Sequence, residues 1–167
     1  LLKNDKSTLP ISREQEIALF GTTSYDFIAG GTGSGNVNRP YVVDLMSGLS
    51  KLGFKLEPEV DAFYKKFMDE EKLRRKRIDG KNPWNIDRER AIEVIPVELI
   101  EKSSRTADVA VITIGRVFGE GKDRNLHYSY LLSDREQELI DRISEAYHAE
   151  GKKVVVVLNV GGYVEMC

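Results

Sequence analysis

A glutamate between two glycines has the surroundings in this chain that best suit acid/base chemistry. Glu120 stands in the triplet Gly119-Glu120-Gly121, shortly after the apolar run at residues 107–115. General acid catalysis requires a carboxyl group that can approach a leaving oxygen and whose pKa can be raised by its surroundings. From spacing alone, an ordinary solvated loop glutamate explains the pattern better, and Asp123 and Arg124 are better explained as a local ion pair.

A glycine-rich segment, Gly31-Thr32-Gly33-Ser34-Gly35, is the second candidate site. A dinucleotide-binding fingerprint requires a third glycine three positions after the second, but that position is Asn36, and the Gly-Lys-Ser/Thr of a phosphate-binding loop is absent. The spacing therefore disfavours nucleotide binding. Two interpretations stay open: a turn that needs positive φ angles, or a loop whose backbone approaches a ligand closely while Ser34 offers its hydroxyl.

The remaining charged and metal-binding residue types point to no further chemistry. The formal net charge is −2, and the basic run at residues 72–77 is better explained as a solvated helix face or helix end than as a phosphate contact. His127 and His148 are too isolated to predict a metal site. No apolar stretch is long enough to span a bilayer. Nucleic acid and membrane are therefore not expected partners, and the single Cys167 leaves the compartment open.

The elements that would position these residues follow an α/β rhythm. Apolar runs predict strands at residues 16–21, 54–56, 107–115 and 153–160, and helical periodicity is present at residues 42–52, 60–78, 96–103 and 133–150. Ser133, with Glu136 three residues later, predicts a capping box at the start of the last helix. We therefore predict a single α/β domain over residues 1–167, a three-layer sandwich with a mostly parallel sheet flanked by helices.

The predicted topology brings the two candidate loops together. In a parallel sheet, ligands bind at the carboxyl ends of the strands. The glycine-rich segment follows the first predicted strand, and the long irregular stretch at residues 116–132, which contains Glu120, follows the third. Residues 80–90 are expected to form a further polar loop.

Three motifs in order give a resemblance that covers nearly the whole chain. Residues 1–11 resemble an "LLKN…LPL" segment, residues 31–37 resemble "GTGSGDV", and residues 119–124 resemble "GEGxDR". Together they resemble the second, α/β domain of family 3 glycoside hydrolases of the β-glucosidase type, which follows a (β/α) barrel domain. The sequence departs from that pattern at Asn36, where the family commonly has Asp.

The resemblance implies a retaining enzyme that hydrolyses terminal β-D-glucosyl residues, with Glu120 as its acid/base. It implies that Ser34 reaches the sugar in the −1 subsite, that no metal or organic cofactor is needed, and that the nucleophilic Asp lies in the barrel domain, which this chain lacks. The expected partners are a β-glucoside or oligosaccharide substrate and that barrel. Both ends of the sequence look cut, and the isolated chain is expected to be inactive.

Two other function classes remain as alternatives. A non-catalytic sugar-binding or interaction module would bind glucose or a barrel partner without turnover, which calorimetry would detect. A nucleotide-binding domain would show a rise in melting temperature with nucleotide.

Overall fold

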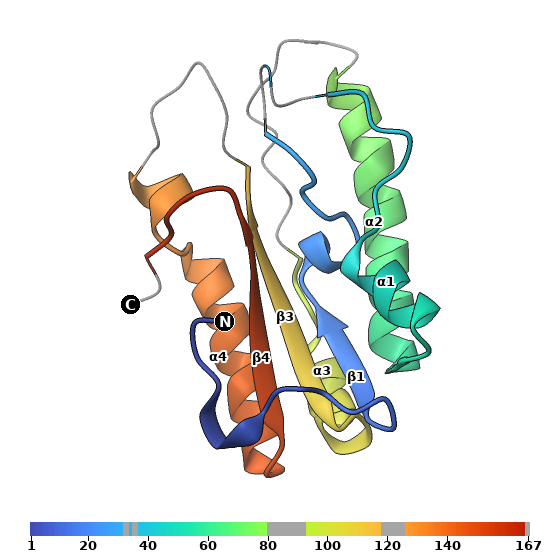
Figure 1. Cartoon of the computed structure of the whole chain (residues 1–167), viewed down its shortest axis with the longest axis vertical. Coiled ribbons are helices and arrows are strands. Elements are labelled where there is room, and N and C mark those ends of the chain that lie inside the picture. Colours follow the sequence, from blue (N-terminus) through green and yellow to red (C-terminus); the bar gives the residue numbers. More distant parts are fainter. Residues whose placement is uncertain (32–33, 35–36, 80–92, 118–125, 166–167) are drawn as a thin grey trace.

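A computed structural model of the chain describes residues 1–31, 34, 37–79, 93–117 and 126–165. Its sheet has four parallel strands, β1 (Glu16–Phe20), β2 (Lys55–Leu56), β3 (Val109–Arg116) and β4 (Lys153–Val160), in the order β2-β1-β3-β4. Within these ranges the α-helices are α1 (Leu45–Lys51), α2 (Pro58–Asp79), α3 (Val97–Thr106) and α4 (Asp134–Ala149). The predicted α/β class with a parallel sheet flanked by helices is confirmed (Figure 1).

The direction of the connections decides which face of the sheet each helix covers. The chain crosses from β1 to β2 in one direction, and from β2 to β3 and β3 to β4 in the other. Because such crossovers are right-handed, α1 lies on one face and α2, α3 and α4 on the opposite face. Figure 1 shows α4 behind β4 and the N-terminal segment in front of it, so the sheet is the middle of three layers.

The core lies between the sheet and the three helices α2, α3 and α4 that cover one of its faces. β1 is buried from Ile17 onward and β3 is buried from Val109 to Ile114, as expected for central strands covered on both faces. β4, at the edge of the described sheet, keeps Val156 38% exposed. Tyr64 of α2 and Tyr147 of α4 are fully buried against Phe20, in edge-to-face contact with its ring at centroid distances of 6.4 and 6.2 Å.

Helices α1 and α4 begin where capping residues stand in the sequence, and hydrophobic periodicity locates their ends less closely. The capping box at the start of α4 is confirmed, with Ser133 and Glu136 each bonded to the other's backbone N–H. Helix α1 begins later than predicted, because Asp44 caps it by accepting from the Ser47 N–H at 2.7 Å. The irregular stretch at residues 116–132 also contains a short π-helix, Leu126–Tyr130.

Candidate active site

The carboxyl ends of β1 and β3 are the place where an open α/β sheet of this strand order is expected to have its ligand-binding crevice. These strands are neighbours, and the order of connections reverses between them. Such a reversal leaves a gap between the loops that leave the two strands. β1 and β3 both end at the upper end of the sheet in Figure 1. In the sequence the glycine-rich segment follows β1, and the loop containing Glu120 follows β3.

The turn after β1 lies directly on the end of β3. Gly21 has φ +91°, and a Cβ built there would stand 2.3 Å from the carbonyl oxygen of Thr113. Only glycine allows both this conformation and this approach. In the following 3₁₀ turn (Thr22–Ser24), Thr23 Oγ1 donates to the Thr113 carbonyl at 3.1 Å, and Ser24 Oγ lies 2.6 Å from Thr113 Oγ1. The start of the β1 loop is therefore fixed to β3.

An asparagine of β4 holds the chain that enters the glycine-rich segment. Asn159 Oδ1 accepts from the Ile28 N–H at 2.7 Å, and Asn159 Nδ2 donates to the Ile28 carbonyl at 3.2 Å. This fork satisfies the backbone groups of Ile28 as a neighbouring strand would. Sequence reasoning did not assign Asn159, although a polar residue inside a valine-rich strand is the signal that marks it.

An ion pair closes the base of the loop that contains Glu120. Arg116, the last residue of β3, forms a bidentate ion pair with Glu136 of α4, with Nη2 2.6 Å from Glu136 Oε2. The same Nη2 also donates to the Leu131 carbonyl at 3.3 Å. Both charged side chains are only 10% exposed. Arg116 therefore joins residues on either side of residues 117–130, so that both ends of this loop are fixed.

The clamp residues Arg116 and Glu136 are stabilised electrostatically. Burial by itself would raise the pKa of Glu136, but hydrogen bonds from Arg116 and from the Ser133 N–H outweigh it, so the pKa lies below its ordinary value. The Ser133 N–H and hydroxyl both donate to Glu136 Oε2 at 2.9 Å. The carboxylate thus serves as both helix cap and counter-ion, and it stays ionised near neutral pH.

The two predicted site residues have different positions relative to this frame. Ser34 lies in the loop between Gly31 and Val37 and is exposed. It is not without a partner in the folded chain. Glu120 lies outside the described residues, which end at Val117 on that side of the loop. In the described ranges, no group of three or more His, Cys, Asp or Glu side chains could hold a metal ion, and no helix there is long and apolar enough to cross a membrane.

Two curated relatives match nearly the whole of this chain. The β-glucosidase A of Butyrivibrio fibrisolvens is 30% identical over 99% of this chain and 21% of its own length. A β-glucosidase of Ruminococcus albus is 31% identical over 99% of this chain and 17% of its own length. The chain therefore spans about a fifth of the length of these relatives.

Solved structures and a family model agree with this. The β-glucosidase 3B of Thermotoga neapolitana in complex with α-D-glucose superposes with a TM-score of 0.88 at 35% identity, over 99% of this chain and 23% of that one. A β-glucosidase of Paenibacillus barengoltzii gives a TM-score of 0.81 at 25% identity, over 99% of this chain and 17% of that one. The glycosyl hydrolase family 3 C-terminal domain model matches residues 1–167. The chain therefore belongs to the C-terminal domain family of the family 3 glycosyl hydrolases.

Proposed function

We propose that this domain supplies the acid/base carboxylate of a retaining β-glucosidase, and that Glu120 is that carboxylate. Family membership and the β-glucosidase relatives support the reaction class. The observation that carries the residue assignment is the clamp at the base of the loop. Arg116 and Glu136 fix both ends of the loop containing Glu120, which follows β3, the neighbour of β1.

In this mechanism Glu120 acts twice. It first protonates the glycosidic oxygen while an aspartate of the barrel domain attacks the anomeric carbon and forms a glycosyl-enzyme. It then accepts a proton from the water that hydrolyses this intermediate, which returns the sugar with retained configuration. The barrel must bring its aspartate within about 5–5.5 Å of the Glu120 carboxyl group. Because the nucleophile is proposed to lie in the barrel domain, the isolated chain is expected to be inactive.

Ser34 has the complementary role of binding the sugar. Ser34 is an exposed residue of the glycine-rich loop, and glycines beside it would let a pyranose approach the backbone closely. A terminal β-glucosyl unit in the −1 subsite presents several hydroxyls, and Ser34 is proposed to hydrogen-bond one of them. The T. neapolitana structure is a complex with α-D-glucose, and this supports the proposal of a subsite for this sugar.

Azide rescue of the full-length enzyme tests the assignment of Glu120. Glu120→Ala is expected to slow cleavage of a glucoside with a poor leaving group roughly 10²–10⁴-fold, because that step needs general acid catalysis. With an activated aryl β-glucoside, azide should restore turnover and yield a β-glucosyl azide. Glu150→Ala, at an exposed position after α4, is the matched control and should keep wild-type rates.

The outcomes separate the residue assignment from the function itself. If Glu120→Ala keeps wild-type rates on both substrates, Glu120 is an ordinary loop residue. If the wild-type full-length protein binds glucose without cleaving any glucoside, the domain is a sugar-binding module.

A further inference from the structure

A buried tyrosine connects the turn at the active-site crevice to a neighbouring buried carboxylate, Glu93. The hydroxyl of Tyr64, in α2, accepts the Gly21 N–H at 2.7 Å and donates to Glu93 Oε1 at 2.5 Å. Tyr64 is fully buried and Glu93 is 6% exposed. The hydrogen-bond chain therefore joins the end of β1, helix α2 and the segment before α3 through buried side chains.

Packing sets the position of this hydroxyl. The Tyr64 ring stacks on Tyr25 at a centroid distance of 5.0 Å and an interplanar angle of 5°. It also makes edge-to-face contacts with Phe20 at 6.4 Å and Phe63 at 5.4 Å. Three aromatic neighbours leave the ring little freedom to turn. Its oxygen therefore stays within hydrogen-bonding distance of the Gly21 N–H, at a position that only glycine can occupy.

Donor and acceptor chemistry gives the chain one direction. A backbone N–H can only donate, so the Tyr64 oxygen accepts from Gly21 and its own proton needs another acceptor. Glu93 supplies that acceptor. Burial raises the pKa of Tyr64 well above its ordinary value, so the phenol keeps its proton. Without a carboxylate or an equivalent carbonyl at position 93, the buried hydroxyl would lose its acceptor.

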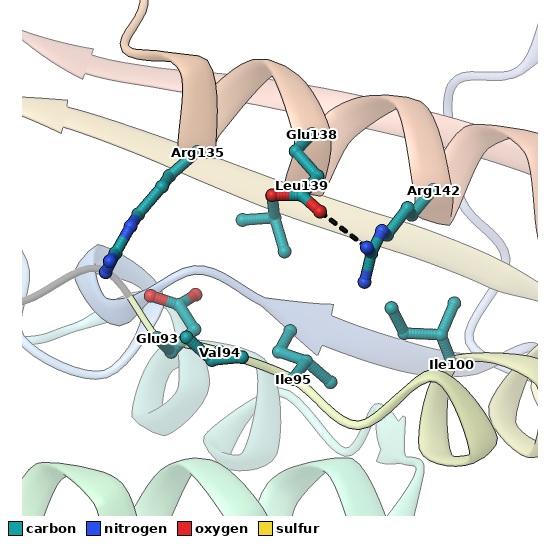
Figure 2. A pocket seen from close by; sticks show the side chains of 8 residues that line it. All are labelled: Glu93, Val94, Ile95, Ile100, Arg135, Glu138, Leu139 and Arg142. Carbon is teal, nitrogen blue, oxygen red and sulfur yellow. Dashed lines mark ion pairs between the residues drawn. The ribbon is translucent and has the colours of Figure 1, made fainter.

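Charged side chains of α4 line a pocket beside Glu93. A pocket of about 230 Å³ separates the Glu93 segment from α4. Figure 2 shows Arg135 extending toward Glu93, and Arg142 paired with Glu138 at 2.5 Å. Burial raises the pKa of Glu93, and the charge of Glu136 adds to the rise. Hydrogen bonds from Tyr64 and from the backbone N–H groups of Glu93 and Gly21 oppose it, so Glu93 interacts with Gly21 directly as well as through Tyr64.

We propose that Tyr64 and Glu93 are positioning residues for the active-site crevice. Glu93 orients the Tyr64 hydroxyl, and that hydroxyl holds the Gly21 amide, from which the loop bearing Ser34 departs. The proposal rests on the proposed function, because it assigns these residues to sugar binding by that loop. Neither side chain touches the substrate. They set the position of the sugar-binding loop before substrate binds, so their loss is expected to raise KM.

Steady-state kinetics of the full-length enzyme on an aryl β-glucoside test this. Tyr64→Phe removes only the hydroxyl and is expected to raise KM roughly tenfold with a smaller change in kcat, because the loop loses its anchor. Glu93→Leu removes the acceptor and should reproduce that increase. Glu93→Gln keeps a carbonyl oxygen for the Tyr64 proton and should restore KM to within about threefold of wild type.

Non-additivity and a matched tyrosine separate positioning from general destabilisation. The double variant Tyr64→Phe/Glu93→Leu should be no worse than either single variant, because both break one chain. Tyr147→Phe is the control: Tyr147 is equally buried, but its hydroxyl makes no well-formed hydrogen bond within the described ranges. This variant should keep the wild-type KM.

Hydrogen exchange at the Gly21 amide gives a readout that needs no activity. Tyr64→Phe should speed exchange there at least tenfold, while Tyr147→Phe should not. If the wild-type enzyme cleaves no glucoside, the proposed function fails, and the exchange data still decide whether the chain of bonds anchors Gly21. A wild-type KM in Tyr64→Phe, additive single variants, or unchanged exchange would each overturn the proposal. If Tyr64→Phe does not fold, the contrast between Glu93→Leu and Glu93→Gln decides it.

Discussion

Replacing Arg116 by methionine tests how much the clamp contributes to stability. Arg116 and Glu136 are each 10% exposed, and their bidentate contact joins the end of β3 to the start of α4. Methionine retains an unbranched apolar stem of similar length, so Arg116→Met removes the charge and its hydrogen bonds while limiting the cavity left behind. The main consequence is that the Glu136 carboxylate stays buried without its counter-ion.

The expected loss of stability is about 3 kcal/mol. Removing one partner of a buried ion pair typically costs about 3–5 kcal/mol. Glu136 keeps its two hydrogen bonds from Ser133, at 2.9 Å each, and these place the estimate at the lower end of that range. For a chain of this size the loss corresponds to a fall of roughly 6–12 °C in melting temperature.

Urea denaturation of the 167-residue chain, followed by far-ultraviolet circular dichroism, measures this loss. Equal m values for variant and wild type are required before the midpoints are compared. Lys102→Met is the matched control. Lys102 pairs with Glu59 at 2.5 Å, but the two side chains are 53% and 50% exposed. Because solvent screens such a pair, the control should lose less than about 1 kcal/mol.

A double variant distinguishes an unpaired charge from lost packing. Arg116→Met/Glu136→Leu leaves no buried charge at the clamp, so its main remaining loss is the capping box, about 1 kcal/mol. It should therefore be about 2 kcal/mol more stable than Arg116→Met alone. If the double variant is the less stable of the two, or if Arg116→Met loses no more than Lys102→Met, the reasoning about the clamp is wrong.

Three further outcomes follow from the same frame. Gly21→Ala should lose about 3 kcal/mol or more in the urea experiment, whereas Gly53→Ala, which shares a positive φ but has no atom within 4 Å of its new Cβ, should lose about 1 kcal/mol; equal losses would contradict the close packing on β3. Because the folded pKa of Glu136 is lowered, its ionisation stabilises the wild type fully above the ordinary pKa of 4.5, and this contribution is lost as pH falls through the folded pKa. The stability advantage of wild type over Arg116→Met should therefore shrink on acidification, and an advantage that grows would refute this sign. Asn159→Asp places an oxygen against the Ile28 carbonyl, so KM for an aryl β-glucoside should rise about fivefold in the full-length enzyme, and an unchanged KM would show that the fork does not position the loop.

Local signals predicted most of the secondary structure. The Ser-x-x-Glu spacing at Ser133 and Glu136 is a physical motif complete within four residues, and the structure has it as predicted. The buried strands followed from continuous apolar runs, since a central parallel strand is covered on both faces. The start of α1 was placed too early, because Val42 and Val43 fit a helical period although they are 45% and 56% exposed, and the true boundary is the Asp44 cap.

The contacts that build the crevice could not be predicted, because their partners are far apart in the sequence. Asn159 and Ile28 are 131 residues apart, and Tyr64 and Gly21 are 43 apart. Nothing local to a buried tyrosine tells whether its hydroxyl has a partner: Tyr64 has two, and Tyr147 has no well-formed one within the described ranges. The candidate residues themselves came from loop motifs, whereas the groups that support them became visible only with the register of the sheet.

The two candidate loops are held by different supports, which gives them separable kinetic signatures. Tyr64 and Asn159 act on the chain that leaves β1, so their loss should weaken sugar binding for every leaving group alike. Arg116 acts on the loop that leaves β3, where Glu120 is proposed to protonate the departing oxygen. A misplaced acid matters more as the leaving group becomes more basic. Arg116→Met should therefore slow poor leaving groups more than activated ones, whereas Tyr64→Phe should slow both equally, and identical leaving-group profiles would show that the loops do not act independently.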